Sequence, residues 1–258
     1  EVYDHHGGHA ATAFYSSPFE RALVVTLDAR GNFISGSVSV AEGTQMTRVA
    51  DSSMFDSLGF FYGAITSLLG FTPHRHEGKV TGLAAYGNAE ACIGIMNEMI
   101  GLEDGQIVGN IGKYYKPFFT GHLPALSEAL KPHKREDVAA AAQLHLEEVA
   151  AAYIYPFIQK YKIPNVCLSG GVFANVRLNM RIRELPGVEN VYIHPQMGDG
   201  GLGVGAVALA MAQHDRPMER PLNDVYLGPS YSNEQIERVL SKHSLPYRPV
   251  EDNVGEAV

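Results

Sequence analysis

The chain has 258 residues, of which 45% are hydrophobic and 19% are charged, so it can build one or two domains and is not disordered throughout. Its formal net charge of −8 argues against a protein that wraps nucleic acid, because such proteins cluster Lys and Arg against the phosphates. Two cysteines are too few for a disulfide framework and indicate a cytoplasmic protein, and the lack of a long apolar run or signal peptide predicts no membrane association.

The N-terminal part of the sequence predicts a helix followed by three antiparallel strands. Residues 6–15 carry small and aromatic side chains in a helical pattern, which ends at Ser16-Ser17-Pro18 because the residue before a proline avoids the helical region. Three runs of β-branched or alternating residues follow, with turns between them, at 22–28, 33–40 and 45–50. This order predicts a three-stranded meander.

The middle of the chain is predicted to be mainly helical. Apolar residues recur with helical spacing over 53–69, 89–100 and 135–162, and Pro156 is expected to kink or split the last of these helices. Residues 70–87 are predicted as a polar loop and residues 101–135 as irregular structure, which could shape an acceptor pocket or form plain surface.

After residue 164 the pattern alternates between strand and helix. Strands are predicted at 165–168 and 190–194, and each is followed by a glycine-rich turn and a helix, at 176–185 and 202–213. Together with the meander, the order βββ, helices, βαβα is that of a ribonuclease-H-like subdomain. The sequence therefore predicts an α/β fold with a mixed sheet and helices on both faces.

Three histidines near the N-terminus form the densest group of potential metal ligands. His5 and His9 are four residues apart and share one face of a helix, whereas His6 and His9 are a poorer pair. Asp28 and Asp199 follow strands, where open α/β sheets present ligand-binding groups. Two imidazoles and two carboxylates suit Fe(II), Mn(II) or Zn(II). Each residue also has an interpretation without a metal. The histidines could lie in a solvated N-terminus, Asp28 could be a turn residue that bonds its own backbone, and Asp199 could cap the helix that follows it.

Two glycine-rich loops, Ser169-Gly170-Gly171 and Gly198-Asp199-Gly200-Gly201, join a predicted strand to a predicted helix. Small residues there let a phosphate or a ribose approach backbone N–H groups, which favours a nucleotide site. Lys79 could bind a phosphate or be an ordinary surface lysine. Asn175 could reach a nucleotide or cap the helix that follows it. The glycine spacings of P-loop and Rossmann proteins are absent from the sequence.

Four segments, taken in order, resemble the O-carbamoyltransferase family, which adds carbamoyl groups to nodulation factors and antibiotics. They are HHGGHAATAFYSSPFERALVVTLDARG, GKVTGLAAYG, CLSGGVFANVRLN and HPQMGDGGLGVGAV, and they recur between Tyr3 and Ala212. The central domain of that family is similar to the ATP-binding protein of the tRNA threonylcarbamoyladenosine pathway. The resemblance implies a fold of the actin-like, sugar-kinase-like superfamily, in which two ribonuclease-H-like halves enclose a nucleotide.

The resemblance also implies a two-step reaction. Carbamoyl phosphate and ATP, with Mg²⁺, would form carbamoyl-adenylate in a separate YrdC-like domain. The central domain would then pass the carbamoyl group to a hydroxyl of a small, sugar-containing acceptor of the nodulation-factor or antibiotic type. A divalent metal, Fe(II) before Mn or Zn, would be held by His5, His9, Asp28 and Asp199, and His5, His9 and Asp199 are the expected catalytic residues. The nucleotide would contact Lys79, Ser169, Gly170, Gly171, Asn175, Gly200 and Gly201.

The same resemblance predicts that the chain is part of a longer protein. Residues 1–215 would form the central domain without its N-terminal start, and this piece alone is not expected to complete the reaction. Residues 216–258 would form a linker and an amphipathic helix, at 233–243, leading toward a missing C-terminal YrdC-like domain. Two alternatives stay open: a tRNA threonylcarbamoyl transferase, which the acidic charge disfavours, and a non-catalytic actin-like nucleotide-binding module, which would leave the histidine pair without a role.

Overall fold

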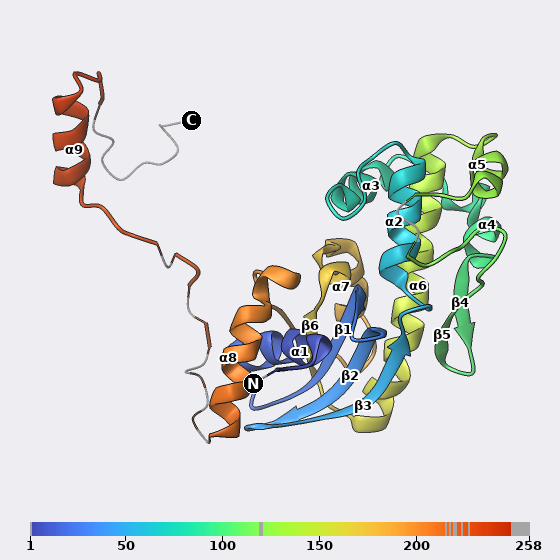
Figure 1. Ribbon diagram of the computed structural model, residues 1–258, viewed down its shortest axis with the longest axis horizontal. Coiled ribbons are helices and arrows are strands. Elements are labelled where there is room, and N and C mark those ends of the chain that lie inside the picture. The colour runs from blue at the N-terminus through green and yellow to red at the C-terminus, as the bar shows by residue number, and fades with distance from the viewer. Residues whose placement is uncertain are drawn as a thin grey trace. The chain divides into compact units, whose positions relative to one another are not determined.

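The structure is a computed structural model, which describes residues 2–118, 121–214, 216, 218, 221–222, 224–226 and 228–248. Its internal contacts divide the chain into two units, Glu1–Asn223 and Asp224–Val258. The first unit holds a five-stranded sheet, the helices that cover it and a separate two-stranded sheet (Figure 1). The described part of the second unit contains the helix α9 (Asn233–Lys242), which confirms the helix predicted at 233–243. Parts of the predicted linker, which begins at residue 216, lie outside the described residues.

The main sheet joins the N-terminal meander to the two later strands. β1 (Arg21–Gly31), β2 (Ile34–Glu42) and β3 (Gln45–Ser53) pair antiparallel, whereas β6 (Asn165–Ser169) and β7 (Asn190–Ile193) continue the sheet in parallel from the other side of β1. The strand order β3-β2-β1-β6-β7 therefore places β1 at the centre. The predicted mixed sheet is confirmed, and the finer ribonuclease-H-like and actin-like assignment stays a prediction.

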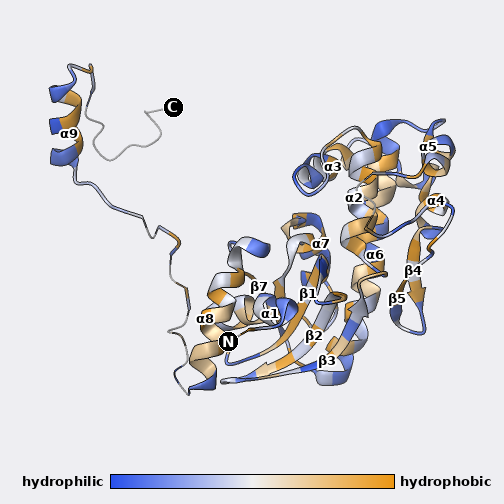
Figure 2. Ribbon diagram, in the orientation of Figure 1, coloured by the Kyte–Doolittle hydropathy of each residue, from blue (hydrophilic) through white to orange (hydrophobic). Residues whose placement is uncertain are grey.

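Helices cover both faces of the sheet, as the sequence predicts. α1 (His5–Ser16) and α8 (Leu202–Gln213) lie on one face, and α2 (Leu58–Leu68) and α6 (Arg135–Tyr161) lie on the other. The side chains of β1 alternate between the two apolar cores, so that Val24 belongs to the first and Leu23 and Val25 to the second. The helix α8 is hydrophobic along most of its length (Figure 2), which fits its place over a core.

The loop predicted at 70–87 is wrong in part, because this segment contains the eight-residue helix α3 (Glu77–Ala84). Two of the eight residues of α3 are glycines and only Val80 is buried. The segment therefore carries neither a strong helix propensity nor an apolar stripe. It forms a helix in the folded protein because it packs against α6.

Residues 101–135, predicted as irregular, contain a hairpin and a short helix. β4 (Ile100–Glu103) and β5 (Gln106–Gly109) pair antiparallel, and α5 (Pro124–Leu130) follows them. His145 of α6 holds the hairpin through a 2.6 Å hydrogen bond between its Nε2 and the carbonyl oxygen of Ile100. These short strands lie outside the alternation of strand, glycine-rich turn and helix that reveals the equally short β7, so no pattern marks them in the sequence.

Pro156 does not split α6, which runs unbroken as the longest helix of the described chain. A proline in a helix leaves the carbonyl four residues earlier without its usual donor. Ala152 and Pro156 both lie on the exposed side of α6, where water can replace that donor. Neither α6 nor any other helix among the described residues is long and apolar enough to cross a bilayer.

Two predicted helices are shorter than expected. The helix predicted at 53–69 begins only at Leu58, because β3 continues to Ser53 and Ser57 caps the helix by accepting a hydrogen bond from the N–H of Phe60. The helix predicted at 89–100 consists of a 3-10 turn, Ala89–Ala91, and the short α4 (Ile93–Asn97). The helix predicted at 176–185 is confirmed as α7 (Val176–Arg183).

The packing of α1 against α8 gives a stability prediction. A Cβ atom added at Gly205 would lie 2.0 Å from the carbonyl oxygen of Gly8 and 2.5 Å from the hydroxyl of Thr12, so the helices would have to separate. We expect Gly205→Ala to lower the free energy of unfolding by about 1–3 kcal/mol. Gly203→Ala is the matched control, because nothing lies within 4 Å of its added Cβ. Urea unfolding measures both variants, and an equal loss in the two would contradict this helix contact.

Candidate metal centre and adjoining cavity

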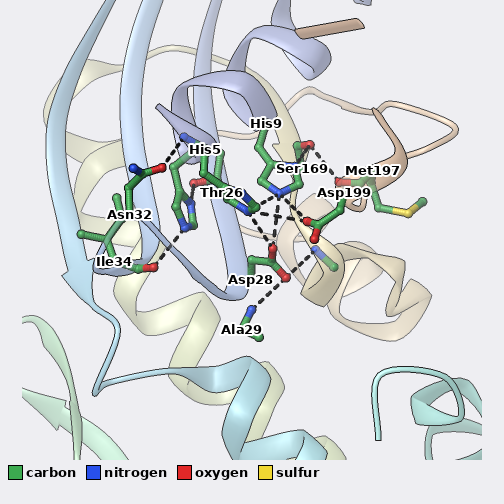
Figure 3. A network of polar contacts seen from close by, with 12 residues as sticks. His5, His9, Thr26, Asp28, Ala29, Asn32, Ile34, Ser169, Met197 and Asp199 are labelled. Carbon is green, nitrogen blue, oxygen red and sulfur yellow. Dashed lines mark hydrogen bonds and ion pairs between the residues drawn. The ribbon is translucent and has the colours of Figure 1, made fainter. Parts of the chain in front are cut away.

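The four predicted metal ligands lie together in the structure. His5 and His9 occupy successive turns of α1, Asp28 lies in β1 near its C-terminal end, and Asp199 lies in the 3-10 turn Asp199–Gly201 after β7 (Figure 3). One ligand atom of each residue lies within 4.8 Å of those of the other three. The predicted convergence of these side chains is therefore confirmed, while the binding of a metal by them stays a prediction.

The distances in this cluster fit the shared coordination of one cation. The Nε2 atoms of His5 and His9 lie 3.2 and 3.3 Å from Asp28 Oδ2, and 3.6 and 3.3 Å from Asp199 Oδ1. The two Nε2 atoms are 3.1 Å apart. Four ligand atoms placed about 2.1 Å from one ion in a tetrahedron would be separated by about 3.4 Å. The donor set, two imidazole nitrogens and two carboxylate oxygens, therefore fits a divalent cation.

Asp28 is the electrostatic centre of the cluster. Burial raises the pKa of this carboxyl, but the hydrogen bonds from His5 and His9 outweigh it, so the pKa lies well below its usual range and Asp28 remains an anion. The hydrogen bond to Asp28 in turn raises the pKa of His5. The side chain of His9 is almost fully buried, whereas that of Asp199 is 70% exposed. Asp199 therefore closes the cluster on its solvent side.

Neighbouring groups hold the ligands in place. Asp28 Oδ1 accepts hydrogen bonds from the backbone N–H groups of Ala29, at 2.8 Å, and Gly171, at 3.3 Å. His9 Nδ1 lies 3.4 Å from the hydroxyl of Ser169, which donates to the carbonyl of Met197. Such contacts fix the ring and carboxylate orientations that a ligand requires.

His6 does not belong to the cluster, although it stands between two of its members in the sequence. Its Nδ1 lies 2.7 Å from the hydroxyl of Thr26 and its Nε2 lies 3.2 Å from the carbonyl oxygen of Ile34. Burial lowers the pKa of His6 to about 4, so this ring is neutral near pH 7. His6 is a buried structural histidine.

A cavity of about 480 Å³ adjoins the cluster at Asp28 and Asp199. Both predicted glycine-rich loops contribute to its wall, the first through Gly171 and the second through Gly198. The N–H of Gly170 donates to the carbonyl of Met197, which ties the first loop to the chain just before the second. The expectation that the two loops open onto one cleft is therefore confirmed.

The structure does not bring every predicted nucleotide residue to this wall. Asn175 and Gly171 line the cavity, whereas the described lining does not include Lys79, Ser169, Gly170, Gly200 or Gly201. The ammonium of Lys79 instead lies 5.7 Å from the ring centroid of Phe71, which precedes α3. Contacts of these residues with a nucleotide stay predictions.

Sequence reasoning missed a second group of residues that line the cavity. They come from the turn before α3, from α3 itself and from α2, and they are Gly59, Tyr62, His74, Arg75, Glu77, Gly78 and Thr81. Arg75 is an exposed cation at this wall. Gly78 and Thr81 belong to the segment GKVTGLAAYG, but no pattern in the sequence shows that this segment reaches the cluster, because the packing of α3 and α2 brings it there.

Asn175 belongs to a buried network of side-chain hydrogen bonds behind the cavity wall. Its amide pairs reciprocally with that of Gln143 on α6: Gln143 Nε2 donates to Asn175 Oδ1 at 3.0 Å, and Asn175 Nδ2 donates to Gln143 Oε1 at 2.8 Å. Asn175 Oδ1 also caps α7 by accepting from the N–H of Leu178, so the predicted capping role is confirmed.

The charges and fixed donors at the ends of this network determine the orientation of both amides. Glu147 can only accept when ionised, so the NH₂ group of Gln143 must face it, at 2.8 Å. The hydroxyl of Tyr62 donates to Gln143 Oε1 at 2.7 Å, and Asn175 Nδ2 also lies 3.2 Å from the hydroxyl of Thr81. All hydrogen-bonding positions of the two amides are thereby used, which makes this wall rigid.

Comparisons with known proteins identify relatives of this chain. A family model described as "Carbamoyltransferase N-terminus" matches residues 1–208. The uncharacterized protein MJ1058 of Methanocaldococcus jannaschii is 32% identical over 99% of this chain and 45% of its own length. The nodulation protein NolO of Bradyrhizobium diazoefficiens is 30% identical over 90% of this chain and 42% of its own length. The chain thus spans less than half the length of these curated relatives.

A solved structure shares the fold of this chain. The crystal structure of T. kodakarensis HypF matches with a TM-score of 0.55, covering 82% of this chain and 36% of that chain. Its sequence identity of 18% limits the likeness to the fold.

The amide network gives a prediction that separates its members. Gln143→Leu removes four hydrogen bonds and takes a buried partner from each of Glu147, Tyr62 and Asn175, so we expect it to lower the free energy of unfolding by about 3 kcal/mol or more. Tyr62→Phe removes only one donor to Gln143 and should lower it by about 1 kcal/mol. Urea unfolding measures both, and equal effects would show that the network is not cooperative.

Proposed function

The chain belongs to the carbamoyltransferase family, and from this premise we propose that it transfers a carbamoyl group from carbamoyl-adenylate to a hydroxyl group of a small-molecule acceptor. One observation carries the proposal: His5, His9, Asp28 and Asp199 converge beside a cavity that both glycine-rich loops help to line. A nucleotide-binding module without transfer chemistry would have no use for such a cluster.

The charges of the site support a divalent cation as its cofactor. Asp28 and Asp199 are carboxylates at the edge of the cavity, and the phosphate of an adenylate is also an anion, so the two would repel each other. When bound to His5, His9, Asp28 and Asp199, Fe(II), or alternatively Mn(II) or Zn(II), would supply charge neutralisation and Lewis-acid polarisation. Arg75, on the cavity wall, adds a protein cation for the phosphate.

The remaining wall suits the flat base of a nucleoside. Ala29, Gly59, Val172 and Ala174 are small or apolar, and the amide network behind Asn175 keeps this part of the wall fixed. The backbone of the first glycine-rich loop would lie against the ribose, and the phosphate would face the Asp199 loop. The acceptor oxygen then forms a bond to the carbamoyl carbon, the bond from that carbon to the phosphate oxygen breaks, the hydroxyl proton is released, and AMP leaves.

The finer parts of the proposal follow the family resemblance. Carbamoyl-adenylate would be made from carbamoyl phosphate and Mg²⁺-ATP by a YrdC-like domain, and the fold would be one ribonuclease-H-like part of an actin-like arrangement. The acceptor would be a sugar-containing molecule of the nodulation-factor or antibiotic type, rather than tRNA. A cytoplasmic location belongs to the same proposal, and it fits the presence of only two cysteines, Cys92 and Cys167, both of which are buried.

Metal binding is the first test of this proposal. We expect the protein to bind about one equivalent of Mn²⁺ or Zn²⁺ in calorimetry, and Asp199→Asn to weaken binding by more than about 10-fold because a charged ligand is lost. The side chain of Asp199 is 70% exposed, so this variant should fold normally. Asp51→Asn, which changes an exposed carboxylate on β3, is the control. Equal affinities in the two variants would contradict the proposed metal centre.

The second test separates the two reaction steps. In the whole protein, we expect Asp199→Asn to abolish carbamoylation of the acceptor while the release of pyrophosphate from ATP and carbamoyl phosphate continues, because adenylate formation belongs to another domain. Both activities are measured on the same preparation, again with Asp51→Asn as control. Equal loss of both steps would show that this domain makes the adenylate, and normal transfer would remove Asp199 from the site.

A further inference from the structure

Three phenylalanines form a surface beside the cavity that the metal and nucleotide sites do not use. The ring of Phe118 lies edge to face against those of Phe55 and Phe60, with centroids 5.5 and 5.1 Å apart. Phe55 is 45% exposed and Phe118 is 37% exposed. Single exposed aromatic side chains are common on proteins, but a contiguous group of them indicates a binding surface. We call Phe55, Phe60 and Phe118 the aromatic ledge.

The aromatic ledge is fixed relative to the candidate metal centre. The hydroxyl of Ser57, which precedes the first residue of α2, donates to the carbonyl of Ala29 at 2.7 Å, and Ala29 directly follows Asp28. A Cβ added at the neighbouring Gly59 would lie 2.8 Å from the backbone of Ala29, so the first turn of α2 packs backbone to backbone against the end of β1. The ligand Asp28 and the ring of Phe60 are thus positioned by one rigid junction.

A second anchor holds the loop that carries Phe118. The hydroxyl of Tyr115, which is buried, donates to the carbonyl of Phe55 at 3.1 Å and accepts from the N–H of Ser57 at 3.2 Å. The three rings of the ledge therefore belong to two segments that are joined by hydrogen bonds. A surface ordered in this way loses little conformational entropy when a ligand binds.

The aromatic ledge is continuous with the cavity. Gly59, which precedes Phe60, and His74 both line the cavity, and the rings of Phe60 and His74 meet at a T-shaped angle with centroids 6.5 Å apart. Ala29, which also lines the cavity, precedes Arg30 in the chain. A molecule on the ledge can therefore extend one group into the cavity, toward Asp28 and Asp199.

Arg30 gives the ledge a polar rim. Its guanidinium carbon lies 5.2 Å from the ring centroid of Phe118, and the residue is exposed. Among the described residues it forms no ion pair with a carboxylate. Its planar N–H donors are therefore available to hydroxyl groups of a ligand that lies on the rings.

We propose that the aromatic ledge and Arg30 form the binding surface for the acceptor, and that a sugar ring of the acceptor lies flat on the phenylalanine rings. The face of such a ring is made of C–H groups, so it packs against aromatic rings and is thereby removed from water. The hydroxyls at the edge of the ring remain in water or bind Arg30. One hydroxyl then points into the cavity. Carbamoylation of that hydroxyl rests on the proposed function. The binding of the ring to the aromatic ledge does not depend on the proposed function.

Saturation-transfer NMR on this chain tests the binding with two simple probes at millimolar concentration. Methyl β-D-glucopyranoside has a C–H face, whereas sorbitol has hydroxyls on an open chain and no such face. We expect saturation of the ring C–H protons of the glucoside, no comparable signal from sorbitol, and about 2- to 10-fold weaker binding in Phe55→Ala and Phe118→Ala. Tyr226→Ala, which removes an exposed aromatic side chain from the second unit, is the control and should bind normally.

The same experiment can overturn the inference. Equal signals from sorbitol, or normal glucoside binding by both phenylalanine variants, would exclude the ledge as a ring-binding surface. Absence of glucoside binding, together with a smaller oligomer in Phe118→Ala by size-exclusion chromatography, would show that the ledge contacts protein instead. Thermal melting confirms folding of each variant, which is expected because both side chains are partly exposed.

A transfer assay in the whole protein distinguishes failure of this inference from failure of the proposed function. If both are right, Phe118→Ala raises KM for the acceptor by about 2- to 10-fold with little change in kcat, because stacking contributes equally before and during the reaction. Ring binding without any carbamoyl transfer would overturn the proposed function and leave the ledge in place. Transfer with an unchanged acceptor KM in both phenylalanine variants would overturn the ledge.

Discussion

One buried carboxylate, that of Asp28, connects the elements on which the candidate site depends. Its oxygens form hydrogen bonds with His5 and His9 of α1 and with the backbone N–H of Gly171 in the loop after β6. An isolated charge at this depth would be costly, so the surrounding elements must supply donors to it. The hydrogen bonds from the two histidines outweigh the cost of burial and keep the pKa of Asp28 low. The fold thus holds an anion near the C-terminal end of its central strand, β1.

The sheet explains why these elements meet. β1, β6 and β7 are parallel and adjacent, so the segments that follow them emerge at the same edge. Asp28, the first glycine-rich loop and the Asp199 loop come from those three strand ends. The α1 helix packs across the same part of the sheet and against α8, which brings its histidines to that edge. The cluster and the cavity are therefore consequences of one strand order.

The two sides of the cavity are held by different interactions. On one side, the amides of Gln143 and Asn175 use their donors and acceptors on each other and on Glu147, Tyr62 and Thr81. On the other side, Ser57 ties α2 to the end of β1 and thereby fixes the aromatic ledge. Because these side chains are used in internal contacts, the groups that a ligand can use are the cluster, the loop backbones, the exposed ring faces and the side chains of Arg30 and Arg75.

Features that depend on local spacing along the chain could be predicted from the sequence. The interval between His5 and His9 placed both on one helix face, and the strand-end positions of Asp28 and Asp199 placed them at one edge of a sheet, so their convergence could be predicted. Alternation and β-branched runs likewise gave the five strands of the main sheet.

The other residues of the site are brought there by tertiary packing, which the sequence does not reveal. The helix α3 has no apolar stripe of its own, and packing against α6 rather than its sequence brings Arg75 and Thr81 to the cavity while leaving Lys79 off the described wall. Gln143 and Asn175 are 32 residues apart, and Phe55 and Phe118 are separated still further, so no periodicity could link them. Contacts of this kind depend on how whole elements pack, and neither spacing nor propensity along the chain encodes that packing in a form that can be recognised.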